Sequence, residues 1–180
     1  TDITIFSFQT VRLPNTIDGG AVVFKDKKLY KAALLARDFG ICRNIFRDQN
    51  GEISPFCDIS TPGFGGTMSD VNSYIGCLQM DNLPKLLKKQ KTNANKWNEE
   101  ICFFKLNNRD EVEPNYWLEG GLSDNKVEDM FLFRGQGFYA SGVHLPNSYY
   151  SVFGAQDHHL GVLEFNKKFV ALPCGWWFDR

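Results

Sequence analysis

The sequence lacks long apolar runs and has almost no net charge. No stretch approaches the roughly 18 consecutive apolar residues that a membrane span needs, so we expect no membrane partner. Twenty basic residues against 21 acidic ones leave a formal net charge of -1. This balance argues against the overall positive field of nucleic-acid-binding proteins, so we expect no nucleic-acid partner.

Closely paired cysteines are also absent. The five cysteines are an odd number, widely spaced, and form no CxxC pair. A disulfide framework or a structural zinc site needs closer, paired spacing. We therefore expect reduced thiols in a cytoplasmic protein.

The residues that are abundant predict a folded protein. Hydrophobic residues make up 43% and charged residues 23%, a composition typical of a packed globular core. Sixteen Phe, together with 4 Trp and 6 Tyr, favour an aromatic-rich core or partner surface. The chain opens directly in a strand-like run, residues 3–6, so we expect it to be a piece of a longer protein.

Short apolar runs and turn residues alternate in the first part of the chain. Residues 3–8 and 21–24 are predicted strands, separated by a segment that contains Pro and Gly. Asp26 fits a helix N-cap, apolar residues follow at helical spacing, and Gly40 fits the C-terminal stop. Residues 41–66 show no period and predict a long loop, and such loops are uncommon unless functional.

The middle of the chain predicts two helices. Thr67 and Asp70 fit a capping box, and the apolar residues between 71 and 78 form one stripe behind it. Pro84 predicts the start of the second helix. The lysines of residues 85–92 invite a nucleic-acid interpretation, but no aromatic platform interleaves them. We interpret them as a solvated helix face.

The last third predicts a strand, a helix and a strand. Residues 116–122 are β-like, Ser123 or Asp124 would cap a short helix, and residues 138–143 would return as a strand. A right-handed βαβ crossover is the expected geometry. Residues 169–173 fit either a last strand or an extended run.

The most specific pattern lies near the start. Ser7 and Phe8 end the first predicted strand, Arg12 follows five residues after Ser7, and an Asp-Gly-Gly turn at residues 18–20 leads into the second strand. This order resembles the lysine-bearing segment of the DegT/StrS-type sugar aminotransferases, which use pyridoxal 5'-phosphate (PLP). In that family a Schiff-base lysine occupies the position of Arg12.

Three further segments carry the resemblance. Residues 62–83 are similar to the family's Gly-containing loop and the helix that follows it. Residues 141–147 and 169–177 are similar to the family's C-terminal small domain. The resemblance implies an α/β fold, the C-terminal part of the aspartate-aminotransferase-like large domain of PLP-dependent transferases followed by a small α+β domain. The expected boundaries are residues 1–66 for the end of the large domain, 67–100 for bridging helices and 101–180 for the small domain.

The resemblance also implies site residues. Ser7 would bind the PLP phosphate through its hydroxyl, and Gln9 would face the cofactor or the substrate. Backbone amides of Gly65 and Gly66 could bind an anion, where the family usually has an Asn that reaches the partner subunit's PLP. The alternative for Ser7 is an ordinary strand-end Ser. Candidates for nucleotide-sugar contacts, or else residues of a surface loop, are His144, Asn147, Tyr149 and Tyr150.

Arg12 departs from the family pattern. Transamination needs an amine that loses its proton, attaches the coenzyme and then acts as a base. A guanidinium stays protonated, so Arg12 can hold a phosphate or a carboxylate but cannot attach the coenzyme. Three origins remain open: an introduced substitution, a natural change in a non-transaminating relative, and a structural arginine. The family's residues that pair with the PLP ring precede the lysine and lie outside this sequence.

The activity implied by the resemblance moves an amino group from an amino-acid donor, typically glutamate, to a nucleotide-linked keto-sugar, in a homodimer. With Arg12 in place, the chain is expected not to transaminate as it stands. The alternatives are a non-catalytic fragment or pseudoenzyme with a dimerisation role, and a relative that dehydrates sugars with PLP. Adjacent His158 and His159 have only Asp157 as an acidic neighbour, so we expect a helix start there and no metal.

Overall fold

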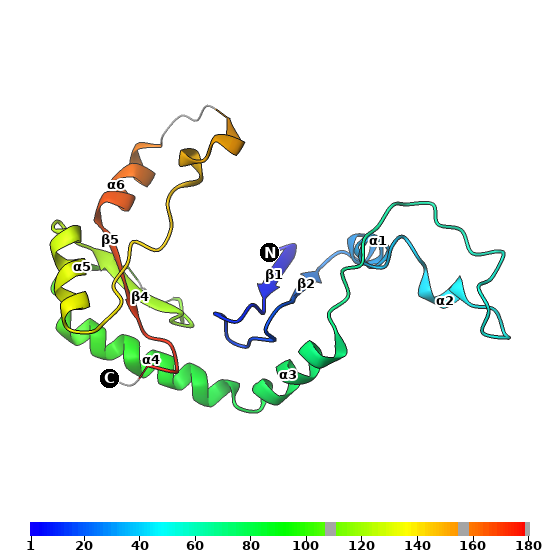
Figure 1. Ribbon diagram of the computed structural model, residues 1–180, viewed down its shortest axis with the longest axis horizontal. Helices are drawn as coiled ribbons and strands as arrows, with labels where there is room; N and C mark the ends of the chain where they lie inside the picture. Colours follow the sequence, from blue (N-terminus) through cyan, green and yellow to red (C-terminus); the bar gives the residue numbers. More distant parts are fainter. Residues whose placement is uncertain (107–110, 155–158, 179–180) are drawn as a thin grey trace. The chain divides into compact units, whose positions relative to one another are not determined.

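The computed structural model describes residues 1–106, 111–154 and 159–178 (Figure 1). Contacts divide the chain into two compact units, Thr1–Asp81 and Asn82–Arg180. Within the described residues, every helix is too short or too polar to span a bilayer.

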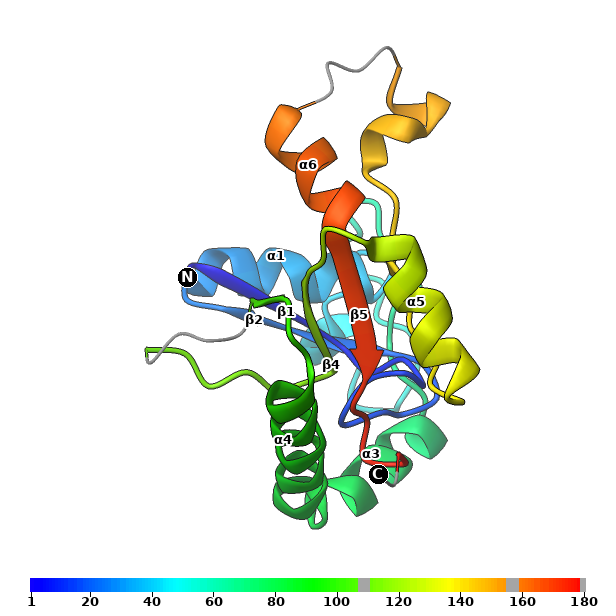
Figure 2. The same cartoon turned by 90° about the vertical axis from the view of Figure 1, so that its left-hand side faces the viewer.

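The first unit begins with a β-hairpin. Strands β1 (Ile3–Ser7) and β2 (Gly20–Phe24) pair antiparallel, and helix α1 (Lys27–Arg37) lies beside β2 (Figure 2). The carboxylate of Asp26 accepts a hydrogen bond from the backbone N–H of Lys28 at 2.6 Å. This bond satisfies a free amide of the first helical turn, and the predicted N-cap is confirmed.

The end of α1 and the loop that follows also agree with the sequence. Gly40 adopts a positive φ of 77° and donates its N–H to the carbonyl of Leu35 at 2.7 Å, which closes the helix. The predicted long loop over residues 41–66 contains one four-residue helix, α2 (Arg43–Phe46). The next helix is α3 (Asp70–Met80).

The predicted capping box of α3 is wrong. Ser69, not Thr67, is the N-cap, and its hydroxyl accepts from the N–H of Asn72 at 3.1 Å. The Thr67 hydroxyl instead donates to the buried carboxylate of Asp38 at 3.3 Å. The Thr67 hydroxyl is therefore bonded to a residue 29 positions away in sequence, and the helix begins after Ser69.

The second unit combines a long helix with a three-stranded sheet. Helix α4 (Leu83–Glu100) has Pro84 in its first turn, as predicted. Strands β3 (Phe104–Lys105), β4 (Leu118–Leu122) and β5 (Phe169–Pro173) form an antiparallel sheet in the order β3-β4-β5. The remaining elements are α5 (Lys126–Gly135), η1 (Asn147–Tyr149), η2 (Ser151–Phe153) and α6 (Leu160–Lys168).

The predicted βαβ crossover is wrong. Residues 138–143 form no strand, and they pair with the sheet at one isolated bridge, between Ser141 and Ala171. Strand β4 already has β3 and β5 as its two neighbours, so it has no free edge for a parallel partner. Phe138 instead packs edge-on against Trp97, with ring centroids 5.0 Å apart.

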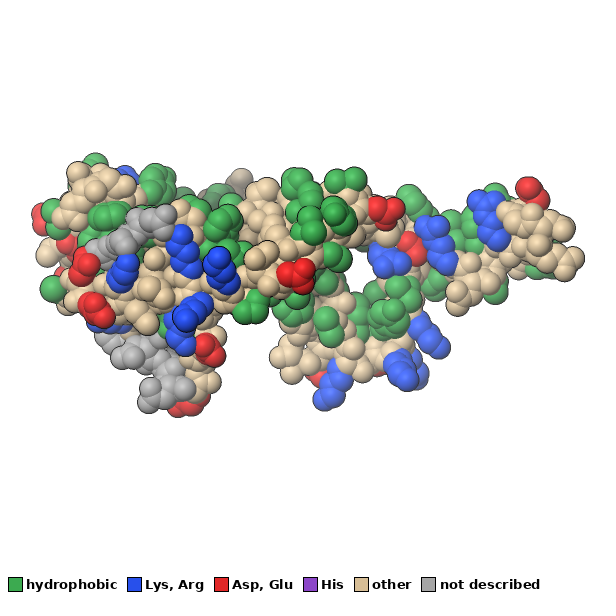
Figure 3. Space-filling model, turned by 90° about the horizontal axis from the view of Figure 1, so that it is seen from below, with side chains coloured by type: hydrophobic (Ala, Val, Ile, Leu, Met, Phe, Trp, Pro, Cys, Tyr) green, Lys and Arg blue, Asp and Glu red, His purple; other side chains and the backbone are tan. Residues whose placement is uncertain are grey.

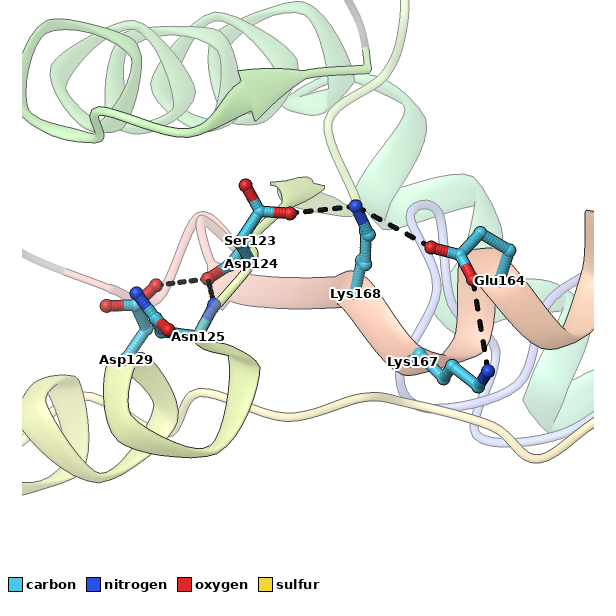
Figure 4. A network of polar contacts seen from close by, with 7 residues as sticks. All are labelled: Ser123, Asp124, Asn125, Asp129, Glu164, Lys167 and Lys168. Atoms are coloured by element: carbon cyan, nitrogen blue, oxygen red, sulfur yellow. Dashed lines mark hydrogen bonds and ion pairs between the residues drawn. The ribbon is translucent and has the colours of Figure 1, made fainter.

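The start of α5 also differs from the prediction. Its N-cap is Asn125, whose side chain makes no capping bond. The hydroxyl of Ser123 accepts from the N–H of Asn125 at 2.9 Å and donates to the carboxylate of Asp129 (Figure 4). Asp124 instead pairs with Lys168 of α6 at 2.7 Å. Ser123 thus fixes the first turn of α5 from outside the helix.

Trp97 is the centre of the second unit's core. Its side chain is 0% exposed, and its indole N–H donates to the carbonyl of Pro173 at 2.7 Å. Phe133 and Phe138 pack edge-on against it, and Phe178 stacks on it with an interplanar angle of 9°. The predicted aromatic core is confirmed for this unit.

Candidate functional site

Three of the predicted site residues lie on one turn of the first unit. Ser7 is exposed at the end of β1, and its hydroxyl oxygen lies 3.5 Å from the N–H of Gln9. The carbonyl of Gln9 accepts from the N–H of Arg12 at 2.8 Å. This turn brings the half-buried Arg12 close in space to the strand end.

The loop that carries Arg12 is closed by backbone bonds at its base. The N–H of Phe8 donates to the carbonyl of Gly19 at 3.0 Å, and the N–H of Thr16 donates to the carbonyl of Phe8 at 2.8 Å. The Thr16 side chain is buried, and its hydroxyl donates to the carbonyl of Asp18. The position of Arg12 is therefore set by a closed loop.

Helix α3 supports this loop from outside. Gln79 accepts from the N–H of Asn15 at 2.9 Å, and the side-chain amide of Asn72 donates to the carbonyl of Asp18 at 3.2 Å. Between them lies Gly76, where an added Cβ would meet the Thr16 methyl at 2.7 Å. One face of α3 thus contacts the loop that carries Arg12. The periodicity of the sequence did not predict this contact.

The loop of residues 63–66, the glycine loop, is hydrogen-bonded to α1. The N–H of Phe64 donates to the carbonyl of Ala36 at 2.8 Å, and the N–H of Gly66 donates to the carbonyl of Arg37 at 2.9 Å. The amide of Gly66 is therefore bonded and not free to bind an anion. Of the two predicted anion ligands, Gly65 keeps that role as a prediction.

A buried carboxylate fixes the same loop. Asp38 is 4% exposed and contacts Arg37 at 3.0 Å, Arg43 at 3.5 Å and the hydroxyl of Thr67. The hydrogen bond from Arg37, with the charges of both arginines, holds the pKa of Asp38 below its usual value. No sequence motif marks Asp38, because Arg37, Arg43 and Thr67 lie on three separate segments.

Ser7 and Gly66 both line a groove of about 750 Å³. Its walls are the two strands of the hairpin, helix α1 and the glycine loop, and most of its lining is apolar. Arg12 and Gln9 are not among its lining residues. The predicted ligands of the first unit thus divide between the rim of this groove and the turn beside it.

The predicted substrate residues lie in the second unit. His144, Asn147 and Tyr149 are exposed on one short segment, where the N–H of Tyr149 donates to the carbonyl of Pro146 at 3.0 Å. Their role toward a sugar stays a prediction.

The structure describes one of the two adjacent histidines, His158 and His159, at which a helix start was predicted. His159 precedes α6 and makes no capping bond, whereas Asp157 and His158 lie outside the described residues. In the part of the chain that is described, no three His, Cys, Asp or Glu side chains gather as a metal site.

Comparison with known proteins agrees with the sequence motifs. The profile of the DegT/DnrJ/EryC1/StrS aminotransferase family matches residues 1–116. A UDP-4-amino-4,6-dideoxy-N-acetyl-beta-L-altrosamine transaminase of Campylobacter jejuni is 31% identical over 100 residues, which are 56% of this chain and 24% of that enzyme.

Solved structures show the same fold. A sugar aminotransferase from Micromonospora echinospora superposes with a TM-score of 0.86 at 23% identity, over 99% of this chain and 48% of its own. A protein described as a sugar aminotransferase from Streptococcus pneumoniae, in its PLP form, gives a TM-score of 0.79 at 19% identity, over 99% and 48%. The predicted fold class is confirmed, and the chain spans about half the length of these proteins.

Proposed function

Since the chain belongs to the DegT/DnrJ/EryC1/StrS aminotransferase family, we propose that it is part of a PLP-dependent aminotransferase of nucleotide-linked keto-sugars. The amino donor in this proposal is an amino acid, glutamate in the first instance. The assembly is a cytoplasmic homodimer. The observation that carries the proposal is the loop with Ser7 and Arg12, which lies within the family match and rests on α3.

The donor groups of the loop fit the phosphate of PLP. The Ser7 hydroxyl is exposed and can donate its proton to an anion, while its oxygen accepts the long contact from Gln9. Bound PLP would supply the aldehyde carbon and the electron-withdrawing ring of the transamination chemistry. Ser7 would hold the phosphate, and Gln9 would orient the bound group.

Residue 12 does not fit covalent attachment of that cofactor. The family position needs a neutral amine, and a guanidinium keeps its proton at every physiological pH. In our proposal Arg12 binds an anionic group of the cofactor or substrate and moves no proton. A non-transaminating member of the family is the second candidate function, and Arg12 is the observation that favours it.

Calorimetry with PLP and with pyridoxal, which lacks the phosphate, tests the proposal. We expect PLP to bind the chain without covalent attachment at residue 12 and pyridoxal to bind at least about tenfold more weakly, since charge-assisted hydrogen bonds contribute roughly 1.5–3 kcal/mol. Ser7→Ala should weaken PLP binding by a similar factor and leave pyridoxal binding unchanged.

Ser54→Ala is the matched control, because the Ser54 hydroxyl also accepts from the N–H two residues on, that of Phe56, at 3.3 Å. It should leave both affinities unchanged. Equal affinity of the unsubstituted chain and Ser7→Ala for PLP, or no preference for PLP over pyridoxal, would contradict the assignment.

A further inference from the structure

Exposed apolar side chains do not by themselves mark a binding surface on this chain, because they lie at many places on it (Figure 3). One surface of the second unit differs, because an arginine lies among its exposed rings. Val127, Phe131 and Arg134 follow one another on α5 at the spacing that places them on one face of the helix. Tyr139 comes after the helix, and its ring contacts Arg134. We call these four residues the α5 patch.

The α5 patch lies on the outer side of the helix. Met130 and Phe133, on the inner side, pack against the apolar core of the unit, and α5 lies beside β5 (Figure 2). The side chains of Phe131 and Tyr139 are instead 64% and 76% exposed. Covering two such large apolar groups with a partner would be favourable.

The guanidinium of Arg134 is held in place beside these two rings. Its central carbon lies 5.9 Å from the ring centroid of Phe131 and 5.4 Å from that of Tyr139, which is within the range of cation–π contacts. Its Nε–H donates to the carbonyl of the buried Ala140 at 2.9 Å. The side chain is therefore oriented before any partner arrives, which lowers the entropy cost of binding.

The charge of Arg134 has no counter-charge in the described part of the chain. Its hydrogen bond uses Nε, and within residues 1–106, 111–154 and 159–178 no acceptor bonds to its two terminal nitrogens and no carboxylate pairs with it. By contrast, Lys91 and Lys168 of the same unit pair with carboxylates at 2.7 Å. The terminal N–H groups of a guanidinium form a planar fork that matches the two oxygens of a carboxylate.

The combination of charge and rings indicates the chemistry of the partner. An apolar partner would bury the guanidinium without a counter-charge, which is costly. A small molecule needs a concave pocket, whereas the two rings are more than half exposed. A nucleic acid needs several cations, and the formal net charge of the chain is -1. An acidic polypeptide segment meets these conditions, since its carboxylate pairs with the guanidinium and its apolar side chains cover the rings.

We propose that the α5 patch binds a segment of a partner protein in which Asp or Glu stands next to an aliphatic or aromatic residue. The carboxylate accepts two hydrogen bonds from the end of the Arg134 guanidinium, and the neighbouring apolar side chain packs on Phe131 and Tyr139. Arginine and tyrosine are among the side chains that most often dominate the binding energy of an interface. The inference uses the second unit alone and goes beyond the proposed aminotransferase activity.

Selection of random linear peptides displayed on phage, with the whole chain immobilised, tests the proposal. We expect the enriched peptides to share Asp or Glu next to an apolar residue. The affinity of one enriched peptide is then measured by calorimetry, alongside a version in which the acid is replaced by its amide. Arg134→Gln and the amide peptide should each weaken binding at least about tenfold, since both remove the same charge-assisted pair. Together they should weaken it little further, because they break one interaction.

Arg47→Gln is the matched control. Arg47 is also exposed, its guanidinium carbon lies 5.6 Å from the ring centroid of Phe46, and it donates to the carbonyl of Gly51 at 2.9 Å. This control removes the same charge and should bind the peptide like the unsubstituted chain. Arg134→Lys keeps the charge but loses the planar fork, so it should weaken binding about as much as Arg134→Gln. Circular dichroism checks that the variants keep their fold.

Several results would overturn the proposal. Enriched peptides without an acid, or no enriched peptide at all, would do so. Equal losses in Arg134→Gln and Arg47→Gln would also do so, as would losses from Arg134→Gln and the amide peptide that simply add. Association of the chain with itself, or with vesicles of anionic phospholipid, that Arg134→Gln abolishes would assign the α5 patch to another occupant. None of these measurements uses PLP, so they are separate from the test of the cofactor assignment.

Discussion

Replacing Trp97 by alanine should strongly destabilise the second unit. The indole is fully buried, contacts three phenylalanine rings and donates to the carbonyl of Pro173. Truncation therefore leaves a cavity and at the same time removes a hydrogen bond from the half-buried Pro173.

The magnitude follows from these contacts. Trp→Ala in a core costs about 3–5 kcal/mol, and for Trp97→Ala this cost includes the loss of the hydrogen bond to Pro173. We take about 4 kcal/mol as the central value. A unit of this size unfolds with a slope of roughly 1.5 kcal/mol per molar urea, so the midpoint should fall by about 2.7 M.

Tryptophan fluorescence during urea unfolding measures this effect. All four tryptophans of the chain lie in the second unit, and three remain in the variant, so the signal reports that unit alone. Trp177→Ala is the control, because this side chain is 56% exposed, and its midpoint should change by less than about 0.7 M. A loss below about 1 kcal/mol for Trp97→Ala would refute the description of the core.

Three further predictions concern the site loop, a buried carboxylate and a thiol. Gly76→Val should push the Thr16 methyl away and speed exchange of the Thr16 amide at least about tenfold, measured by hydrogen exchange; unchanged exchange would contradict the role of α3. Because its pKa is lowered, the Asp38 carboxylate stabilises the fold at pH values above the ordinary Asp pKa, and this contribution is lost as pH falls through the lowered pKa. Urea midpoints measured by circular dichroism should therefore fall less between about pH 5 and 3 in Asp38→Asn than in the unsubstituted chain. An equal fall of the midpoint in both proteins would contradict this. Burial raises the pKa of the Cys174 thiol to about 12, so iodoacetamide at about pH 8 should label exposed Cys77 and spare Cys174 in the native chain, as read by peptide mass spectrometry.

Local signals predicted the elements that depend on neighbouring residues. Asp26 caps α1, Gly40 ends it and Pro84 opens α4, because each acts on a backbone group within five residues. The strand signal at residues 3–8 was also sufficient, because β-branched and aromatic residues dominate that run. Residues 169–173 form a strand, which was one of the two alternatives left open by the sequence.

Contacts between distant segments account for the errors. Thr67 fits a cap by spacing, but the carboxylate of Asp38 takes its hydroxyl. Residues 138–143 look like a strand, but both edges of β4 are already occupied. Likewise, Gln79 supports the Arg12 loop through a bond that spans 64 positions. The turn that holds Ser7 and Arg12 was found by its motif, whereas its support on α3 follows only from the tertiary structure.

The most direct test of the account asks whether residue 12 occupies the cofactor-attachment position. The chain is incubated with PLP, reduced with borohydride, digested and mapped by mass spectrometry, alongside Arg12→Lys and the neutral control Arg12→Gln. We expect coenzyme on residue 12 only in Arg12→Lys, at a level above that on the exposed Lys27 of the same sample. Labelling of residue 12 in Arg12→Lys that does not exceed labelling of Lys27 would contradict the assignment.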